Sequence, residues 1–306
     1  MEPRERAIGS VLGLALGDAL GAPFEFRRAT EIPSPLPAFE LPWVGREPGS
    51  WTDDTAMARN LWRSLIERGG ALDLDDVLRR HVTWLASDPP DVGAQTRLAL
   101  STIVPGRPIE EAARLVWERR GPEVSAGNGS VMYCAPLGVA YANRSEELHD
   151  LAPALSALTH WDGRCRTACR AVTLAVAALV RGDRGPEAVA RALAAVGGAD
   201  GGEELEYLVD AAGVQRPIDG PDQGFVLFTA GVALRQVATE RPFEQGLLEV
   251  VALGGDTDTN AAVTGALLGA LHGERALPPA WLAPLQDRDE IGREAERLAQ
   301  VAVRSY

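Results

Sequence analysis

Apolar residues recur at helical spacing along most of this chain. The segment ERAIGSVLGLALGDAL, residues 5–20, is one case, and the stretch AAVTGALLGALHG, residues 261–273, is another. Few stretches alternate apolar and polar residues with the period of two that is typical of a strand. We therefore expect an all-α fold. Further helices, with ends placed to within ~2–4 residues, are predicted at about 53–68, 74–87, 91–103, 108–119, 130–143, 147–158, 163–182, 186–197, 224–239, 242–252 and 287–304.

Glycines recur every four residues in two of the predicted helices. This spacing puts them on one face of a helix, where each glycine costs roughly 1 kcal/mol of helix propensity. A face without side chains lets another helix approach closely, and we expect that packing to offset the cost. The two stripes are Gly9, Gly13, Gly17 and Gly21, and then Gly265, Gly269 and Gly273.

The segment EIPSPLPAFELPWVGREPGS, residues 31–50, interrupts the helical pattern. It holds five prolines and two glycines, so it cannot form a regular helix and we expect a long loop. Long loops inside compact domains are often functional lids, and we hypothesise that this one forms a flap over a site. No other stretch is typical of an interdomain linker, so we expect residues 1–306 to form one domain.

The composition narrows the class of protein. Apolar residues make up 46% of the 306 residues, which is enough for a sizeable core. The 43 acidic and 30 basic residues give a formal net charge of −13. A protein that binds nucleic acid through phosphate contacts needs a basic face, so this charge argues against such a partner. It is compatible with an enzyme that binds cations.

Neither the cysteines nor the N-terminus predicts an exported or membrane protein. Cys165 and Cys169 lie four residues apart on a predicted helix, where a disulfide is geometrically poor; we expect buried thiols in a reducing compartment. The apolar N-terminal segment is similar to a signal peptide, but Glu5 and Asp18 interrupt its basic and apolar regions. The longest other apolar run has ten residues, too few to span a bilayer. We expect a cytoplasmic protein with no membrane partner.

Two short motifs place paired acids at the start of predicted helices. WTDDT, residues 51–55, precedes an amphipathic helix, and GGDTDTN, residues 254–260, precedes a glycine-striped one. Helix capping by Thr52 or Asp53, and by Asp256, explains one acid of each motif and leaves the other unexplained. Carboxylate and hydroxyl oxygens are also hard ligands that suit Mg²⁺ or Mn²⁺ rather than zinc. Metal binding is the second interpretation, and two such motifs favour it more than one alone.

Residues 127–130, GNGS, and His160 are candidates for substrate contact. Glycines permit close backbone approach, and amide groups at a helix N-terminus favour phosphate. An ordinary turn with Ser130 as the helix cap explains the same residues. His160 precedes the helix predicted at 163–182, so a capping or packing role competes with a place in a pocket.

Five motifs extend over nearly the whole chain: GLALGDALGAPFEF (13–26), WTDDT (51–55), GNGSVM (127–132), TH (159–160) and GGDTDTNAAVTGALLGA (254–270). In content and order they resemble the ADP-ribosylglycohydrolase family, which includes enzymes that release ADP-ribose from modified arginine. The resemblance implies an all-α fold and a centre of two divalent cations, Mg²⁺ or Mn²⁺. It also implies that the substrate is an ADP-ribosylated protein or a small ADP-ribose conjugate.

Carried over motif by motif, the resemblance implies roles for single residues. The expected metal ligands are Thr52, Asp53 and Asp54 for one ion, and Asp256, Thr259 and a bridging or shared Asp258 for the other. The residues expected to contact substrate are Gly127, Asn128, Gly129, Ser130 and His160. Glu25 would reach the second ion or act on the nucleophilic water. The expected catalytic residues are therefore Glu25 and Asp258.

Hydrolysis of a glycosidic bond at ribose C1 suits such a centre. The reaction passes through an oxocarbenium-like state, and two cations can hold the ribose hydroxyls and lower the pKa of a water molecule. A carboxyl group that no metal binds can take the proton of that water or return it to the leaving group. We prefer Glu25 to Asp18 for this role, because a buried position that hydrogen-bonds a loop is an equally good interpretation of Asp18.

Two features leave alternatives open. Tyr133 and Cys134 stand where the family commonly has arginine and an aliphatic residue, so contacts to phosphate or adenosine would differ here. The resemblance favours arginine as the acceptor, but the sequence gives no test that separates it from serine, acetyl or nucleic-acid leaving groups. The alternatives are a metal-dependent phosphohydrolase, which uses the same ligands, and an ADP-ribose-binding module without turnover.

Overall fold

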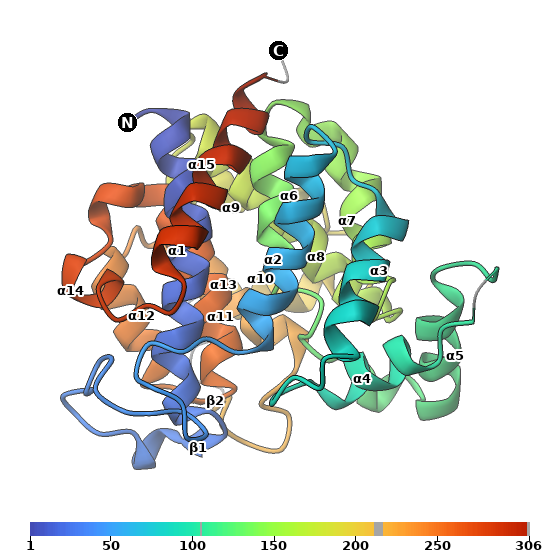
Figure 1. Ribbon diagram of the computed structural model, residues 1–306, viewed down its shortest axis with the longest axis horizontal. Helices are drawn as coiled ribbons and strands as arrows, with labels where there is room; N and C mark the ends of the chain where they lie inside the picture. Colours follow the sequence, from blue (N-terminus) through green and yellow to red (C-terminus); the bar gives the residue numbers. More distant parts are fainter. Residues whose placement is uncertain (105, 211–216, 305–306) are drawn as a thin grey trace.

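The computed structural model describes residues 1–104, 106–210 and 217–304, and it confirms the prediction of an all-α fold (Figure 1). The first eight α-helices are α1 (Pro3–Gly21), α2 (Asp53–Glu67), α3 (Leu74–Leu85), α4 (Ala94–Ser101), α5 (Glu111–Arg120), α6 (Ala135–Ala140), α7 (Leu148–Ser156) and α8 (Gly163–Arg181). The others are α9 (Gly185–Ala194), α10 (Gly202–Val209), α11 (Val226–Ala238), α12 (Phe243–Val251), α13 (Thr257–His272), α14 (Pro279–Leu282) and α15 (Arg288–Arg304).

Short elements connect several of these helices. The 3-10 turns are η1 (Ala22–Phe24), η2 (Ala29–Glu31), η3 (Pro122–Val124), η4 (Ala142–Glu147) and η6 (Glu274–Ala276). Two strands of two residues each, β1 (Arg27–Arg28) and β2 (Gly254–Gly255), pair in antiparallel fashion. This small pairing fixes the end of α1 beside the start of α13.

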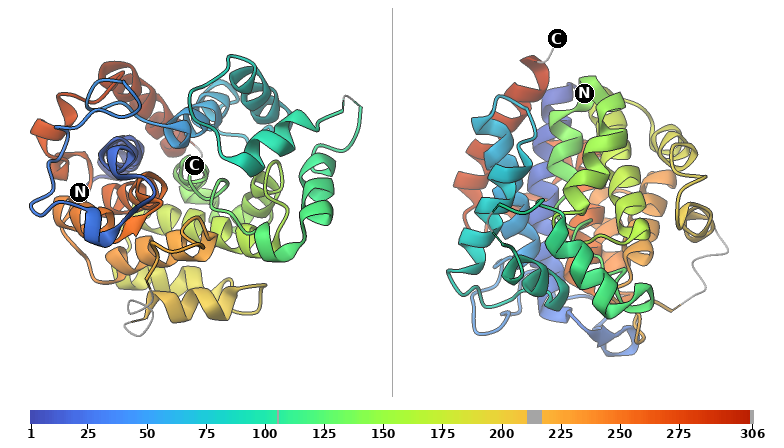
Figure 2. Two further views of the ribbon diagram at one scale, coloured as in Figure 1. Left: turned by 90° about the horizontal axis from the view of Figure 1, so that it is seen from below. Right: turned by 90° about the vertical axis from the view of Figure 1, so that its right-hand side faces the viewer.

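Helices α1 and α13 form the centre of the molecule, and their glycine stripes face each other. The pairing is antiparallel: a Cβ atom on Gly13 would lie 2.2 Å from the carbonyl oxygen of Gly265, and one on Gly17 would lie 1.9 Å from that of Ala261. The predicted close approach of another helix is thereby confirmed. Seen end-on in Figure 2, α1 lies between α15 and α13.

The α1 segment is also apolar and long enough, from Pro3 to Phe24, to cross a membrane. However, 89% of its most apolar stretch of 18 residues is buried inside the fold. Its apolar surface is therefore used in packing, in agreement with the prediction of a core helix. No other helix in the described ranges has that length and composition.

Some predicted boundaries are wrong for identifiable reasons. The helix predicted at 130–143 extends only from Ala135 to Ala140, because residues 128–133 form consecutive turns and Pro136 occupies the first turn of α6. The helix predicted from residue 91 begins at Ala94, after the prolines of the preceding loop. The short helices α10 and α14 and the β1–β2 pair were not predicted, since each is shorter than the windows in which periodicity is visible.

The loop predicted at 31–50 is confirmed: after η2 it contains only an isolated bridge between Trp43 and Arg46. It packs against the α14 side of the molecule. The rings of Phe39 and Trp281 lie 5.6 Å apart, and the amide of Gln286 donates a hydrogen bond to Gly49 O over 3.0 Å. Its role as a flap stays a prediction.

Candidate functional site

Three helix ends meet at one end of the molecule, at the bottom of Figure 1. These are the C-terminal end of α1 and the N-terminal ends of α2 and α13. Beyond α1, the amide of Phe26 donates to Gly255 O over 2.7 Å, which places Glu25 beside the first turn of α13. The positive ends of α2 and α13 favour the carboxylates gathered there.

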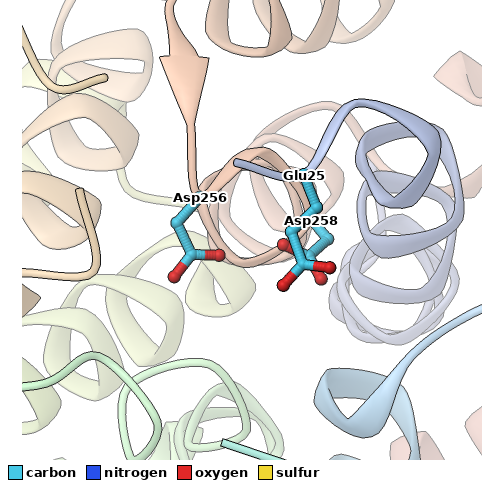
Figure 3. Close-up of side chains that lie close together, drawn as sticks. All are labelled: Glu25, Asp256 and Asp258. Atoms are coloured by element: carbon cyan, nitrogen blue, oxygen red, sulfur yellow. The ribbon is translucent and has the colours of Figure 1, made fainter. Parts of the chain in front are cut away.

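Glu25, Asp256 and Asp258 form the tightest acidic group in this region (Figure 3). Each offers a carboxylate oxygen, and these oxygens all lie within 4.8 Å of one another. Asp256 is the N-cap residue of α13 but makes no side-chain cap bond, and Asp258 lies in the first turn. Capping therefore does not account for either acid of this motif.

The WTDDT and GGDTDTN motifs are in direct contact. Thr52 caps α2, and its hydroxyl donates to Asp54 Oδ2 over 3.2 Å. The hydroxyl of Thr259 donates to the same oxygen over 3.4 Å, although the two residues are 205 positions apart. The structure thus brings the two predicted halves of a metal site together.

A cavity of about 410 Å³ lies over these acids. Its acidic side is lined by Glu25, Asp53, Asp91, Asp256, Asp258 and Thr259. The glycine loop and its neighbours line it too: Gly127, Asn128, Gly129, His160, Arg120 and Met132. Most of the predicted ligand and substrate residues therefore surround a single cavity.

Three predicted residues do not line this cavity. Asp54 lies beneath Thr259 and is almost fully buried. Thr52 lines a neighbouring cavity. The hydroxyl of Ser130 is buried 2.9 Å from that of Ser156. The alternative of Ser130 as a helix cap is wrong, because α6 begins five residues later with Cys134 as its N-cap residue.

Asn128 connects the glycine loop to the acidic group. Its amide donates to Asp256 Oδ2 over 2.9 Å and to the hydroxyl of Thr229 over 3.0 Å. Thr229 in turn donates to the side-chain oxygen of Asn260 over 2.7 Å. These hydrogen bonds hold Asp256 Oδ2 in place and do not involve Asp256 Oδ1.

The ring of His160 lies directly beneath the glycine loop. A Cβ atom on Gly129 would be 2.8 Å from His160 Cε1, so only glycine leaves room for the ring. His160 Nδ1 lies 3.0 Å from the hydroxyl of Thr159, which fixes the orientation of the ring. Burial lowers the pKa of His160 to about 4, so the imidazole is neutral near pH 7.

Asp18, the alternative acid–base candidate, supports the α2 motif instead. Its carboxylate accepts hydrogen bonds from the amide of Thr52 at 2.9 Å and from the amide and hydroxyl of Thr55 at 2.9 and 2.5 Å. Burial raises its pKa to about 6. Its buried, hydrogen-bonding role is confirmed, with the difference that its partners belong to the N-cap and first turn of α2 rather than to a loop.

The acidic group carries more negative charge than its protein neighbours balance. Burial raises the pKa of Asp53, Asp54 and Asp258 well above the usual range, and neighbouring carboxylates add to the effect. Burial, followed by the charges of Asp91 and other aspartates, raises the pKa of Glu25 to about 9. Buried charges of one sign require partners of the other.

Two buried oxygens, Asp54 Oδ1 and Asp258 Oδ1, have no hydrogen-bond partner in the described part of the chain. They lie among carboxylate and threonine oxygens, which are the ligands that Mg²⁺ and Mn²⁺ accept. The residues present therefore fit one or more hard divalent cations.

Sequence reasoning missed Asp91. Its carboxylate lines the cavity, interacts with Asp53 and raises the pKa of both Asp53 and Glu25. It lies in the loop SDPPDVG between α3 and α4, which has no helical period. The sequence signal for it was the pair Asp88 and Asp91 on either side of two prolines. We missed this signal because we predicted a helix that begins at residue 91.

The sequence of this chain is similar to those of known proteins. A family model described as ADP-ribosylglycohydrolase matches residues 1–306. The chain is 31% identical over 306 residues to the ADP-ribosyl-[dinitrogen reductase] glycohydrolase of Rhodospirillum rubrum, with 97% of each chain covered. It is 27% identical over 319 residues to the ADP-ribosylarginine hydrolase Tri1 of Serratia proteamaculans (strain 568), covering 98% of this chain and 81% of the relative.

A solved structure has the same fold as this chain. The structure titled "ADP-ribosylglycohydrolase-related protein complex" aligns with a TM-score of 0.80 and 34% sequence identity. The alignment covers 98% of this chain and 99% of the other.

Proposed function

Because the chain belongs to the ADP-ribosylglycohydrolase family and is a hydrolase of ADP-ribosyl glycosidic bonds, we propose that it removes ADP-ribose from arginine side chains of modified proteins. The bond cleaved is the one between ribose C1 and the guanidino nitrogen, and ADP-ribose is released. The observation that carries the proposal is the contact between the two acidic motifs beneath one cavity. The name of the Serratia relative supports arginine as the acceptor.

The proposal includes two divalent cations, Mg²⁺ or Mn²⁺. Their ligands would be Thr52, Asp53 and Asp54 for one ion and Asp256, Thr259 and a shared Asp258 for the other. The unpartnered oxygens of Asp54 and Asp258 support this assignment. When bound, such cations hold ribose hydroxyls and lower the pKa of a water molecule.

Glu25 is the acid–base residue of the proposal. It lines the cavity beside Asp256 and Asp258 and is less buried than either. Burial, and then the negative charges of Asp91 and the other aspartates around it, raise its pKa to about 9, and cations bound among those carboxylates would bring the pKa down towards neutrality. Glu25 would take the proton of the attacking water as the C1–N bond breaks, and would return it to the leaving nitrogen.

The side of the cavity formed by the glycine loop and Arg120 would bind the diphosphate and the adenosine-proximal ribose. The backbone of Gly127 and Gly129 is open to close approach, and Arg120 supplies a positive charge at the same wall. His160 is neutral and supports the loop from beneath. This side has the chemistry for phosphate, whereas the acidic side repels it without cations.

Product analysis tests the proposal against its alternatives. The protein is incubated with an ADP-ribosylated arginine peptide, an ADP-ribosylated serine peptide and O-acetyl-ADP-ribose, and the nucleotides are separated by ion exchange. We expect intact ADP-ribose, formed fastest from the arginine peptide. Formation of AMP would identify a phosphohydrolase, and ADP-ribose binding without turnover of any substrate would identify a binding module.

A further inference from the structure

A second cavity borders the acidic group, and none of the glycine-loop residues 127–130 lines it. Its volume is about 370 Å³, and we name it the indole cavity because Trp43, Trp51 and Trp84 line it. It shares two residues, Asp53 and Asp91, with the cavity over the acids. The pair formed by these two carboxylates is therefore the boundary between the two cavities.

The proposed reaction needs space on both sides of the scissile bond. Ribose C1 must lie over Glu25, Asp256 and Asp258, and the diphosphate must extend towards the glycine loop and Arg120. The acceptor side chain has to leave in another direction. The indole cavity is adjacent to the acidic group in such a direction, with Asp53 and Asp91 at the junction.

The walls of the indole cavity suit a cationic side chain on an apolar stem. Trp51 and Trp84 are each half-buried. The Arg59 guanidinium lies over the Trp51 ring, 5.7 Å from its centroid, whereas no basic side chain of the described residues lies over Trp84, so the indole surface of Trp84 remains available for contact. Asp88 and Asp91 add two carboxylates, and neither lies within 4 Å of a basic side-chain nitrogen in the described ranges. Guanidinium groups bind to indole faces and to carboxylates.

Two of the three arginines that line the indole cavity are paired with carboxylates. Arg59 contacts three carboxylates, Asp287 at 2.8 Å, Glu290 at 2.9 Å and Glu294 at 3.3 Å. Arg63 contacts Glu290 and Glu294 at 3.0 and 2.8 Å. The positive charge of these two arginines is thus balanced by α15 and the turn before it. Arg46 also lines the cavity, and its guanidinium lies over the Trp43 ring, 5.9 Å from the ring centroid.

On these grounds, and resting on the proposed function, we propose that the indole cavity is the acceptor-side subsite, which holds the polypeptide segment that carries the modified arginine. The stem of the arginine packs on the indole face of Trp84, beside Trp51. Asp88, exposed at the rim, interacts with the cationic peptide. The subsite therefore selects arginine-linked peptides over small neutral conjugates, while the ADP-ribose moiety is bound elsewhere.

The test measures kcat/KM for an ADP-ribosylated arginine peptide in Trp84→Ala and Asp88→Asn, and Kd for ADP-ribose by calorimetry. Asparagine tolerates the positive φ of 52° at position 88, so the second variant removes charge without straining the backbone. We expect kcat/KM to fall about tenfold in Trp84→Ala and about threefold in Asp88→Asn, mainly through KM. Kd for ADP-ribose should change less than about twofold. Tyr207→Ala, which removes an exposed aromatic ring outside both cavities, is the matched control.

Unchanged peptide kinetics in both variants would overturn the assignment, as would equal losses in kcat/KM and in ADP-ribose affinity. A wild-type protein that releases no ADP-ribose from any substrate gives a different outcome. It would overturn the proposed function itself, and the subsite with it.

Discussion

At the scale of single residues, the site is defined by atoms that the fold leaves without partners. Asp54 and Asp258 are almost completely buried, yet one oxygen of each accepts no hydrogen bond in the described part of the chain. A carboxylate that served only as a helix cap would use its oxygens on backbone amides. Helix capping therefore does not account for these two oxygens, which in the proposed function would be metal ligands.

The glycine loop leads to a first prediction. In Gly129→Ala the new methyl group would lie 2.8 Å from His160 Cε1 and 3.0 Å from the hydroxyl of Thr96, so the loop or the ring must move. We expect ADP-ribose affinity to fall roughly tenfold, about 1.4 kcal/mol, as measured by calorimetry. Gly198→Ala is the control, since a Cβ atom there meets nothing within 4 Å. Equal affinity in the two variants would contradict the role given to this loop.

His81 leads to a prediction about pH. Burial lowers the pKa of folded His81 from 6.5 to about 3, while the unfolded histidine takes up a proton below about 6.5. The unfolded state thus binds more protons in this range, and stability falls as pH is lowered from 6.5 towards 3. His81→Gln keeps an acceptor for the amide of Asn60, 3.3 Å from His81 Nδ1.

Urea unfolding of both proteins between pH 7 and pH 4 measures this contribution. Wild type should lose about 1.4 kcal/mol per pH unit more than His81→Gln below pH 6. Parallel pH profiles would show that His81 is protonated in the fold or does not contribute.

Most acidic residues of the site could be predicted from the sequence, because each of the two motifs has one more carboxylate than helix capping uses. It did not allow Asp91 to be placed, because a loop acid has no periodic neighbours to mark its direction. It also left the position of Ser130 open. The side chain is turned inward to Ser156 by contacts between segments that are distant in sequence.

At the scale of elements, the α1–α13 pair positions the site. The two helices are in contact through their glycine stripes, and their ends carry Glu25 on one side and Asp256 and Asp258 on the other. The β1–β2 pairing then fixes the register, with Arg27 opposite Gly255. A shift of either helix would separate the acids.

Gly17→Ala tests this packing. Its methyl group would lie 1.9 Å from the backbone oxygen of Ala261, which no side-chain rotation can relieve. We expect the free energy of unfolding to fall by on the order of 3 kcal/mol, measured by urea denaturation. Gly292→Ala in α15 meets nothing within 4 Å and should stabilise the protein by roughly 0.5–1 kcal/mol. A Gly17→Ala protein as stable as wild type would contradict the arrangement of the two helices.

Helix periodicity and glycine spacing were visible in the sequence, and they predicted the long helices and the close packing of α1. Short elements were not visible. Helix α10 buries only Leu205, Leu208 and Val209 besides its first glycine, too few residues for a recognisable period. The β1–β2 pair has two residues in each strand, and its partners are more than two hundred residues apart.

At the scale of the whole molecule, the formal charge of −13 is concentrated partly at one buried site. The chain brings the C-terminal end of α1 and the N-terminal ends of α2 and α13 to the same end of the fold (Figure 1). Their acids lie beside a phosphate-compatible loop on one side and the indole cavity on the other. In the proposed function, cations bound in this arrangement would attract an anionic substrate that the protein alone would repel.

The most direct test of this account is a titration of metal-stripped protein with Mn²⁺, in which bound metal and ADP-ribose release from ADP-ribosylarginine are measured in the same samples. We expect two Mn²⁺ ions to bind per chain, turnover to appear with them, and EDTA to abolish it. In Asp258→Asn, turnover should fall by at least about a hundredfold and metal affinity should weaken. Full activity after exhaustive metal removal, or unchanged Mn²⁺ binding and turnover in Asp258→Asn, would contradict the central claim that the two acidic motifs form one catalytic metal centre.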